Sequence, residues 1–292
     1  MNMTQNFTPD DIKQAVEDIK KLKPEYTPML DLYEKIFIAQ ENAKKSIKLD
    51  EFIIPADKLK HKLNEQFPLV TIPEFTFDSR VSGKLFDEIC GILTTNENEL
   101  SGPVKQIAGL AADKKIDTGK LFSSFINEDE SAFDSIEKEH GTDKRILAFI
   151  VFNSLKPSLS VFAQNISVHL ENTGAWEKGY CPVCGSAPEL SLFEENGKRF
   201  MVCGFCGHKW ASRRIYCPFC ENSNHETLRY IEIEGEEEHR ADVCDKCKKY
   251  IKTTDVKKTT RLVYPPLEYQ ATPYIDLLIE EMGFSAGNNK SE

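Results

Sequence analysis

Eight of the nine cysteines lie within residues 181–247, where they form four Cys-x-x-Cys pairs. The pairs are Cys181 and Cys184, Cys203 and Cys206, Cys217 and Cys220, and Cys244 and Cys247. A disulfide scaffold would space its cysteines irregularly, whereas two intervening residues let both sulfurs of a pair turn towards one metal ion. We therefore predict that all eight cysteines are metal ligands in two four-thiolate sites.

The segments between the pairs predict how the pairs combine. Eighteen residues separate Cys184 from Cys203, and the turn Glu195-Asn-Gly-Lys198 divides two short apolar runs there. Asn-Gly is a preferred pair for a tight hairpin turn. The alternating segment 228–233 precedes Gly235 in the same way between the third and fourth pairs. Each hairpin should therefore bring its flanking pairs to one ion. A crossed arrangement, first with third and second with fourth, is the alternative, and it would break both hairpins.

Four sulfur ligands complete a tetrahedron and leave no coordination position for a substrate. The ions would then be structural or redox-active, and both zinc and a single rubredoxin-type iron suit this geometry. A catalytic dithiol would open a helix in a βαβ unit, whereas these pairs lie between predicted strands. No glycine-rich phosphate loop, Ser-His-Asp order or paired carboxylate site is present, so we predict no catalytic residues and no enzyme.

The periodicity of apolar residues changes near Gly174 from about 3.6 to about 2. Before it, a helix start at Thr8-Pro9-Asp10-Asp11 leads into apolar stripes at helical spacing, interrupted at residues 50–76, 102–103 and 141–143. After it, turn residues recur every few positions, and a last helix is expected at residues 272–282 after the Pro265-Pro266 break. We predict an α+β protein with three parts. These are an all-α helical bundle (1–175), a first rubredoxin-like or zinc-ribbon module (176–215), and a second module with a short C-terminal helix (216–292).

Composition and charge favour a soluble cytoplasmic protein. The 292 residues are 40% hydrophobic and 29% charged, and the formal net charge is −10, so we expect neither nucleic acid nor an anionic membrane as a partner. The N-terminus has no basic start and no apolar run, so no secretory signal is expected. The longest apolar run, residues 146–152, is much shorter than the ~20 residues of a membrane span. In the cytoplasm thiols stay reduced, which again favours metal over disulfides.

One aromatic and basic patch follows the second cysteine pair. Tryptophan with arginine is the composition of an interface hot spot, so we predict a partner-binding surface at Trp210, Arg213 and Arg214. The alternative is that Trp210 packs beside the cysteines while the arginines offset thiolate charge.

The other candidate groups favour structural roles. Cys90 lies on the apolar face of residues 81–93 and is predicted to be a core thiol. The run 234–238 is predicted to be a solvent-exposed hairpin end. Eight thiolates already fill two tetrahedra, so no histidine is needed as a ligand. The histidines considered are His169, His208, His225 and His239.

These motifs together resemble the FdhE family of formate dehydrogenase accessory proteins. The resemblance is specific over about residues 176–252 and extends to 276–283. It rests on segment 179–188, on Cys203-x-x-Cys206 followed by Trp210 and Arg214, on Cys217-x-x-Cys220, and on segment 241–252. Two residues depart from the family pattern as we expect it. Asp242 stands in place of Glu, and Lys248 stands in place of Gly directly after a Cys-x-x-Cys pair, a motif that we also call a knuckle.

The resemblance implies a cytoplasmic maturation factor that binds the catalytic subunit of a molybdenum- or tungsten-dependent formate dehydrogenase. It also implies rubredoxin-like metal sites on two ribbon modules beside a helical domain. Two alternatives are a nucleic-acid-binding zinc-ribbon protein and a rubredoxin-like electron carrier.

Overall fold

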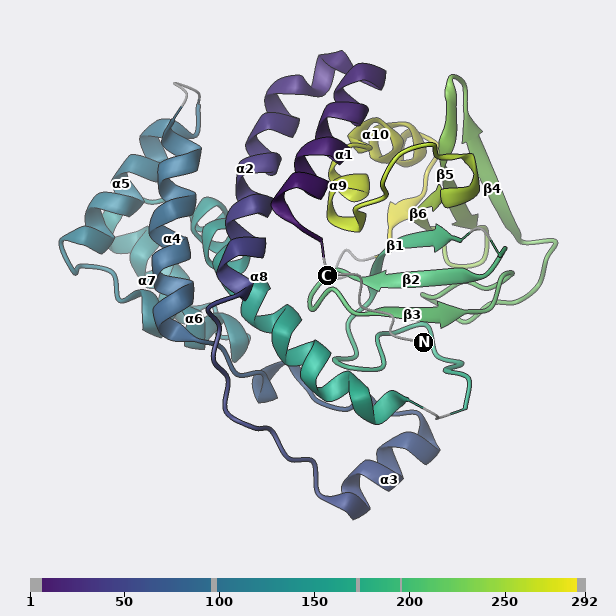
Figure 1. Cartoon of the computed structure of the whole chain (residues 1–292), viewed down its shortest axis with the longest axis horizontal. Helices are drawn as coiled ribbons and strands as arrows, with labels where there is room; N and C mark the ends of the chain where they lie inside the picture. Colours follow the sequence, from purple (N-terminus) through teal and green to yellow (C-terminus); the bar gives the residue numbers. More distant parts are fainter. Residues whose placement is uncertain (1–6, 96–98, 172–173, 195, 288–292) are drawn as a thin grey trace. The chain divides into compact units, whose positions relative to one another are not determined.

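The computed structural model describes residues 7–95, 99–171, 174–194 and 196–287 (Figure 1). It contains both helices and a sheet, which confirms the predicted α+β class. The α-helices are α1 (Pro9–Leu22), α2 (Thr27–Lys44), α3 (Ala56–Glu65), α4 (Ser79–Thr94), α5 (Ser101–Ala112), α6 (Thr118–Ile126), α7 (Ser131–His140), α8 (Lys144–Ser167), α9 (Pro265–Gln270) and α10 (Pro273–Glu281). The strands are β1 (Pro188–Phe193), β2 (Arg199–Cys203), β3 (Lys209–Ser212), β4 (Leu228–Ile233), β5 (Glu236–Cys244), β6 (Lys249–Asp255) and β7 (Ser285–Ala286). Single 3-10 turns lie at η1 (Pro24–Tyr26), η2 (Ile72–Glu74), η3 (Val168–Leu170) and η4 (Val256–Lys258).

The described residues divide into two compact units. One comprises those of Met1–Leu30, Ile53–Val70 and Ala163–Glu292, so α1 and α3 belong to the same unit as the whole sheet. The other comprises those of Asp31–Phe52 and Thr71–Phe162, with α4 to α7 and most of α2 and α8. The predicted boundaries near residues 175 and 215 separate parts of the chain that are expected to fold independently. This division stays a prediction.

Helix ends follow the expected local chemistry. Thr8 caps α1 in a reciprocal capping box with Asp11, as the helix start at this position predicted. Gly141 ends α7 with a left-handed φ of 66°, and Asp143 accepts a hydrogen bond from the backbone N–H of Arg145 at the start of α8. Cys90 of α4 is a buried core thiol, as predicted, and burial raises its pKa to about 12.

Prolines were misread at two positions. Gly102-Pro103 and Pro265-Pro266 were predicted as breaks, but they lie in the first turns of α5 and α9. Proline is tolerated in a first turn because its missing N–H would have no helical partner there. Pro157, in contrast, lies inside α8.

Helix α8 with η3, residues 144–170, is long and apolar enough by length and composition to cross a membrane. Of its most apolar window, 61% is buried inside the protein, which is the pattern of a core helix and makes this weak evidence for a span. The uninterrupted apolar run 146–152 is shorter than this helix because polar Asn153 and Ser154 follow the run within it.

The sheet joins two three-stranded meanders. Strands β1, β2 and β3 pair antiparallel in sequence order, and so do β4, β5 and β6. The two meanders meet where β1 pairs parallel with β6, which gives the order β3-β2-β1-β6-β5-β4, with β7 also pairing with β6. The predicted hairpins are therefore present; in the first, Glu195 lies outside the described residues.

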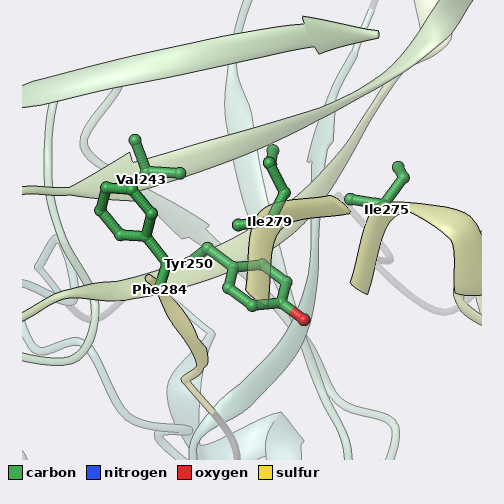
Figure 2. Close-up of a cluster of buried hydrophobic side chains, with 6 residues drawn as sticks. Val243, Tyr250, Ile275, Ile279 and Phe284 are labelled. Carbon is green, nitrogen blue, oxygen red and sulfur yellow. The ribbon is translucent and has the colours of Figure 1, made fainter. Parts of the chain in front are cut away.

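Helix α10 packs on one face of this sheet. Ile275 and Ile279 of α10 and Phe284 after it lie against Val243 and Tyr250 of the strands (Figure 2). Asp276 of α10 also accepts a hydrogen bond from the Tyr250 hydroxyl. The predicted C-terminal helix therefore exists and covers the second meander. The apolar side chains of Leu278 and Met282 in the same predicted segment are exposed.

Candidate metal centres

The first two cysteine pairs form one cluster at the start of β1 and the end of β2. The Sγ atoms of Cys181 and Cys206 lie 3.7 Å apart, and those of Cys184 and Cys203 lie 3.4 Å apart. All four Sγ atoms lie within 4.8 Å of one another. The first hairpin thus unites its two flanking pairs, as predicted.

The third and fourth pairs form a second cluster in the same relation to β4 and β5. The Cys217–Cys247 and Cys220–Cys244 sulfur separations are both 3.7 Å. All four Sγ atoms again lie within 4.8 Å of one another. The crossed arrangement of pairs is therefore wrong.

Both clusters fit a tetrahedral metal ion. Four sulfurs bound to one zinc ion at about 2.3 Å lie about 3.8 Å apart, close to the separations observed. The same separations are far longer than a disulfide bond, and all eight cysteines are free thiols. The clusters could therefore hold two metal ions, and thiolate donors suit zinc and iron alike.

The same backbone turn recurs at all four cysteine pairs. The residue after each second cysteine donates its N–H to the carbonyl of the first cysteine, at 2.8 to 3.1 Å. That residue has a left-handed φ: 77° at Gly185, 74° at Gly207, 58° at Glu221 and 57° at Lys248. Lys248 thus adopts the conformation of the glycine expected there, and the fourth turn closes like the others.

Comparison with known proteins agrees with this arrangement. A family model described as the FdhE central domain matches residues 180–214, which contain the first cluster. A curated FdhE homologue from Aquifex aeolicus is 28% identical over 276 residues, covering 91% of this chain and 88% of the relative. The chain resembles FdhE proteins over most of its length. The resemblance inferred from the motifs is thereby confirmed.

Two further FdhE proteins show how the likeness is distributed. A homologue from Haemophilus influenzae is 30% identical over 127 residues, or 42% of this chain and 41% of the relative. The crystal structure of FdhE from Pseudomonas aeruginosa superposes with a TM-score of 0.69 over 97% of this chain and 95% of that one, at 17% identity. The FdhE fold therefore spans nearly the whole chain, including the helices.

The two cysteine clusters differ in exposure. The first is fully buried, and burial raises the pKa of the Cys181 thiol well above its ordinary value. In the second, Cys220 and Cys247 are only half-buried. Burial also raises the pKa of Cys244, but hydrogen bonds from the backbone N–H of Cys247 and the Asn222 amide outweigh it and lower this pKa to about 7. The second centre is thus the more accessible to solvent.

A segment distant in sequence supports the first cluster. The backbone N–H groups of residues 69–70 donate to the carbonyls of Pro182 and Val183, at 2.9 and 3.0 Å. The Tyr180 hydroxyl donates to the backbone carbonyl of Gln66 at 2.9 Å. Locally, Leu69 and Val70 are a short apolar pair after Pro68, and such a pair does not indicate a contact with the cysteine motifs.

Gly179 lets the two cysteine-bearing regions approach each other. A Cβ atom at this position would lie 1.9 Å from the carbonyl oxygen of Pro218, inside the third knuckle. Only glycine permits so close a backbone approach. The close packing against Pro218 therefore explains why a glycine occupies position 179.

The structure corrects the predicted patch. Trp210 is only 2% exposed and lies on β3 opposite Met201, so it cannot form a partner-binding surface. Its local sequence, with charged neighbours, suggested exposure, but alternation along β3 turns it inwards. Arg213 and Arg214, which follow β3, are exposed, and their role in partner binding stays a prediction.

The acidic run 234–238 forms a hairpin end as predicted, with Glu234 and Glu237 exposed, but Glu236 and Glu238 are half-buried and ion-paired. Glu236 accepts from His239 at 3.0 Å, and Glu238 pairs with Arg261 at 2.7 Å. His239 and Arg261 also both contact Glu268, which is fully buried. The run therefore supplies part of a buried ionic network between β5 and the chain around α9.

Proposed function

We propose that this chain is a non-catalytic cytoplasmic accessory factor that binds the catalytic subunit of a formate dehydrogenase and is needed for its maturation. The observation that carries the proposal is the pair of four-cysteine clusters in a chain that resembles an FdhE homologue over 91% of its length. Four protein sulfurs at each cluster would leave no place for a substrate. The work of the protein would then lie in its surfaces.

The eight cysteines would hold two ions, zinc or iron, one in each cluster. A bound ion would cross-link the two knuckles of its meander, and because metal binding is coupled to folding, it would contribute to the stability of the sheet. The half-buried second cluster favours a second candidate function, that of a rubredoxin-like electron carrier. A reversible change in visible absorbance on reduction of purified protein would support this candidate.

Elemental analysis tests the ligand assignment. Wild-type protein should carry about two ions per chain, and Cys203→Ser and Cys217→Ser should each retain about one, since they remove ligands from different clusters. Cys90→Ser is the matched control, because Cys90 is buried in α4 and belongs to neither cluster. Two ions retained in either cluster variant would contradict the assignment.

The accessory role is tested by removal of the native factor. Cells without it should lose formate dehydrogenase activity, and expression of this chain should restore that activity. The tagged chain at native level should also co-purify the catalytic subunit, identified by mass spectrometry. Full formate dehydrogenase activity in cells without the factor would refute the accessory role. Restored activity without any complex with the catalytic subunit would refute the binding step.

A further inference from the structure

The sheet face opposite α10 carries a pocket of about 380 Å³ beside the second cysteine cluster. Side chains alternate along β5, so Ala241 and Val243 face α10 while Arg240 and Asp242 face the other way. The pocket is lined by strand residues of both meanders and by the segment 214–219. Cys217 and Cys244 are among its lining residues.

A buried arginine holds the base of this pocket. Arg199 donates to the backbone carbonyl of Tyr216 at 2.8 Å, to the Ser191 hydroxyl at 2.9 Å and to the Asp242 carboxylate at 2.8 Å. Asp242 also accepts from Arg240 Nε at 2.9 Å. One carboxylate thus serves two guanidinium groups, which leaves a net positive charge in a region of restricted solvent.

Arg240 lies between two aromatic rings. Its guanidinium carbon is 4.8 Å from the centroid of Phe193 and 4.5 Å from that of Tyr230. Stacking on both sides fixes the plane of the group. Only Nε hydrogen-bonds to a described residue, so the terminal nitrogens keep their donors for a ligand.

Arg214 adds a third guanidinium to the same ring. It lies 5.8 Å from the centroid of Phe193, and its side chain forms no ion pair with any residue that the structure describes. Arg199, Arg214 and Arg240 therefore surround Phe193 with a single carboxylate among them. Four thiolates with one divalent ion would give the neighbouring cluster a charge of about −2, and the cations of the lining (Arg199, Arg214, Arg229, Arg240 and Lys249) still outnumber this charge and that of Asp242. On a chain with a net charge of −10, this pocket is therefore a local exception that would select an anion.

We propose that this pocket binds a carboxylate carried next to an apolar side chain by a segment of a partner protein. Arginine pairs are the preferred partners of carboxylates, through two parallel hydrogen bonds. Ile215 and Tyr230 line the pocket and are each 55% exposed, so it offers an apolar surface beside the charge. A free small anion would use only part of this volume. Nucleic acid would need an extended basic surface, whereas the formal net charge of this chain is −10.

The proposal rests on the proposed function for the identity of the partner, which would be the catalytic subunit, but not for the chemistry of the pocket. That chemistry is tested by NMR titration of the metal-loaded full chain. The probes are a capped tripeptide of isoleucine, glutamate and phenylalanine, its glutamine analogue, sodium acetate and a short oligothymidylate. The glutamate peptide should bind roughly ten-fold more tightly than the glutamine peptide, as expected for a charge-assisted hydrogen bond.

Two neighbouring arginines give a matched pair of variants. Arg214→Gln should remove most of the preference for glutamate. Arg213→Gln should keep it, because Arg213 does not line the pocket but lies over the ring of Tyr216. Equal binding of the two peptides, equal effects of the two substitutions, or tighter binding of acetate or oligothymidylate than of the peptide would each overturn the proposal.

The catalytic subunit provides the second arm. Arg214→Gln should weaken its capture by the full chain several-fold, and Arg80→Gln, at an exposed arginine outside the pocket and outside the predicted patch, should not. If wild-type protein captures the subunit and both variants do so equally, this pocket is not its docking site while the accessory function stands. If wild-type protein does not capture the subunit, the proposed function fails, and the peptide titration alone decides the pocket chemistry.

Discussion

Glu221 and Lys248 occupy backbone positions that suit glycine. Both follow the second cysteine of a knuckle and have φ near 57°, whereas the two knuckles of the first cluster use Gly185 and Gly207 there. For a residue with a Cβ atom this conformation costs about 1–2 kcal/mol. The second cluster therefore closes its two turns against local strain, and the backbone hydrogen bonds from Glu221 to Cys217 and from Lys248 to Cys244 form in spite of it.

Replacing Lys248 by glycine should stabilise the protein. The relief of strain exceeds the ~0.5–1 kcal/mol that glycine costs through the greater freedom of the unfolded chain, so we expect a net gain of about 0.5 kcal/mol. The ion pair lost with Asp245 is exposed and contributes little. The gain is measured by urea unfolding of metal-loaded protein.

Lys246→Gly is the control for this change. Lys246 is exposed in the same turn but has no left-handed φ, so glycine there should lower the stability by about 0.5–1 kcal/mol. Shifts of the same sign in both variants would show that the left-handed backbone carries no strain.

At the scale of single residues, spacing predicted more than composition did. The pairing of the eight cysteines followed from Cys-x-x-Cys spacing and two hairpin turns, because both are local. The exposure of Trp210 did not follow, since burial depends on which face of β3 packs inwards. The supporting contacts of residues 69–70 join positions more than 100 apart in the chain, and one sequence has no local signal for them.

At the scale of elements, a buried ionic network connects β5, α9 and the end of α1. His239 lies between Glu236 and Glu268, Arg261 pairs with Glu268, and Lys23 after α1 pairs with Glu236 at 2.9 Å. Each buried carboxylate thus has cationic partners, which a buried charge requires. The network binds the N-terminal helix to the sheet.

The stabilisation from this network should depend on pH. Burial opposes the charged form of His239, but hydrogen bonds to Glu236 and Glu268 outweigh it and raise the pKa of His239 above 6.5. A raised pKa gives stability that is complete below 6.5 and is lost as the pH rises through the folded value. Despite burial, Arg261 and His239 lower the pKa of Glu268 to about 2, so its contribution is complete above 4.5 and is lost towards pH 2.

His239→Gln should therefore destabilise the protein most between pH 4.5 and 6.5, by roughly 3 kcal/mol, because one cation of a buried network is removed. The difference from wild type should shrink at higher pH. Urea unfolding of both metal-loaded proteins from pH 4.5 to above the folded pKa of His239 measures it, and effects of pH on metal binding cancel in the difference. His225→Gln, at an exposed histidine, is the control. A difference that stays constant from below pH 6.5 to well above it would mean that folding does not shift the pKa of His239.

Local signals also explain which elements were predicted. Capping residues such as Thr8 and the turn at Gly141 mark helix ends directly, and they were read correctly. Proline was read as a break at Pro103 and Pro265, where its position in a first turn decides the outcome. Glu236 and Glu238 of the acidic run were predicted to be solvated because their partners Lys23 and Arg261 lie elsewhere in the chain.

At the scale of the molecule, the two ribbon modules share one sheet. The parallel pairing of β1 with β6 joins residues about 60 apart in the chain, and the local sequence of neither strand predicts this pairing. The sequence predicts that the chain divides near residue 175, because periodicity changes there. The compact units of the structure divide the chain differently, because α1 and the segment 66–70 belong to the same unit as the sheet. Lys23 connects α1 to the sheet, and residues 69–70 donate backbone hydrogen bonds to Pro182 and Val183.

Removal of metal should decide between these two divisions. In hydrogen exchange on the full chain, a chelator should release the clusters and lower amide protection in β1 to β6 and, with them, in residues 66–70 and in α1, since these segments depend on the sheet for their contacts. Helices α4 and α6 have their own buried core, with Phe86 against Phe122, and should keep their protection. If α1 instead stays protected together with α4 while the sheet exchanges, the boundary near residue 175 is the one at which the chain unfolds.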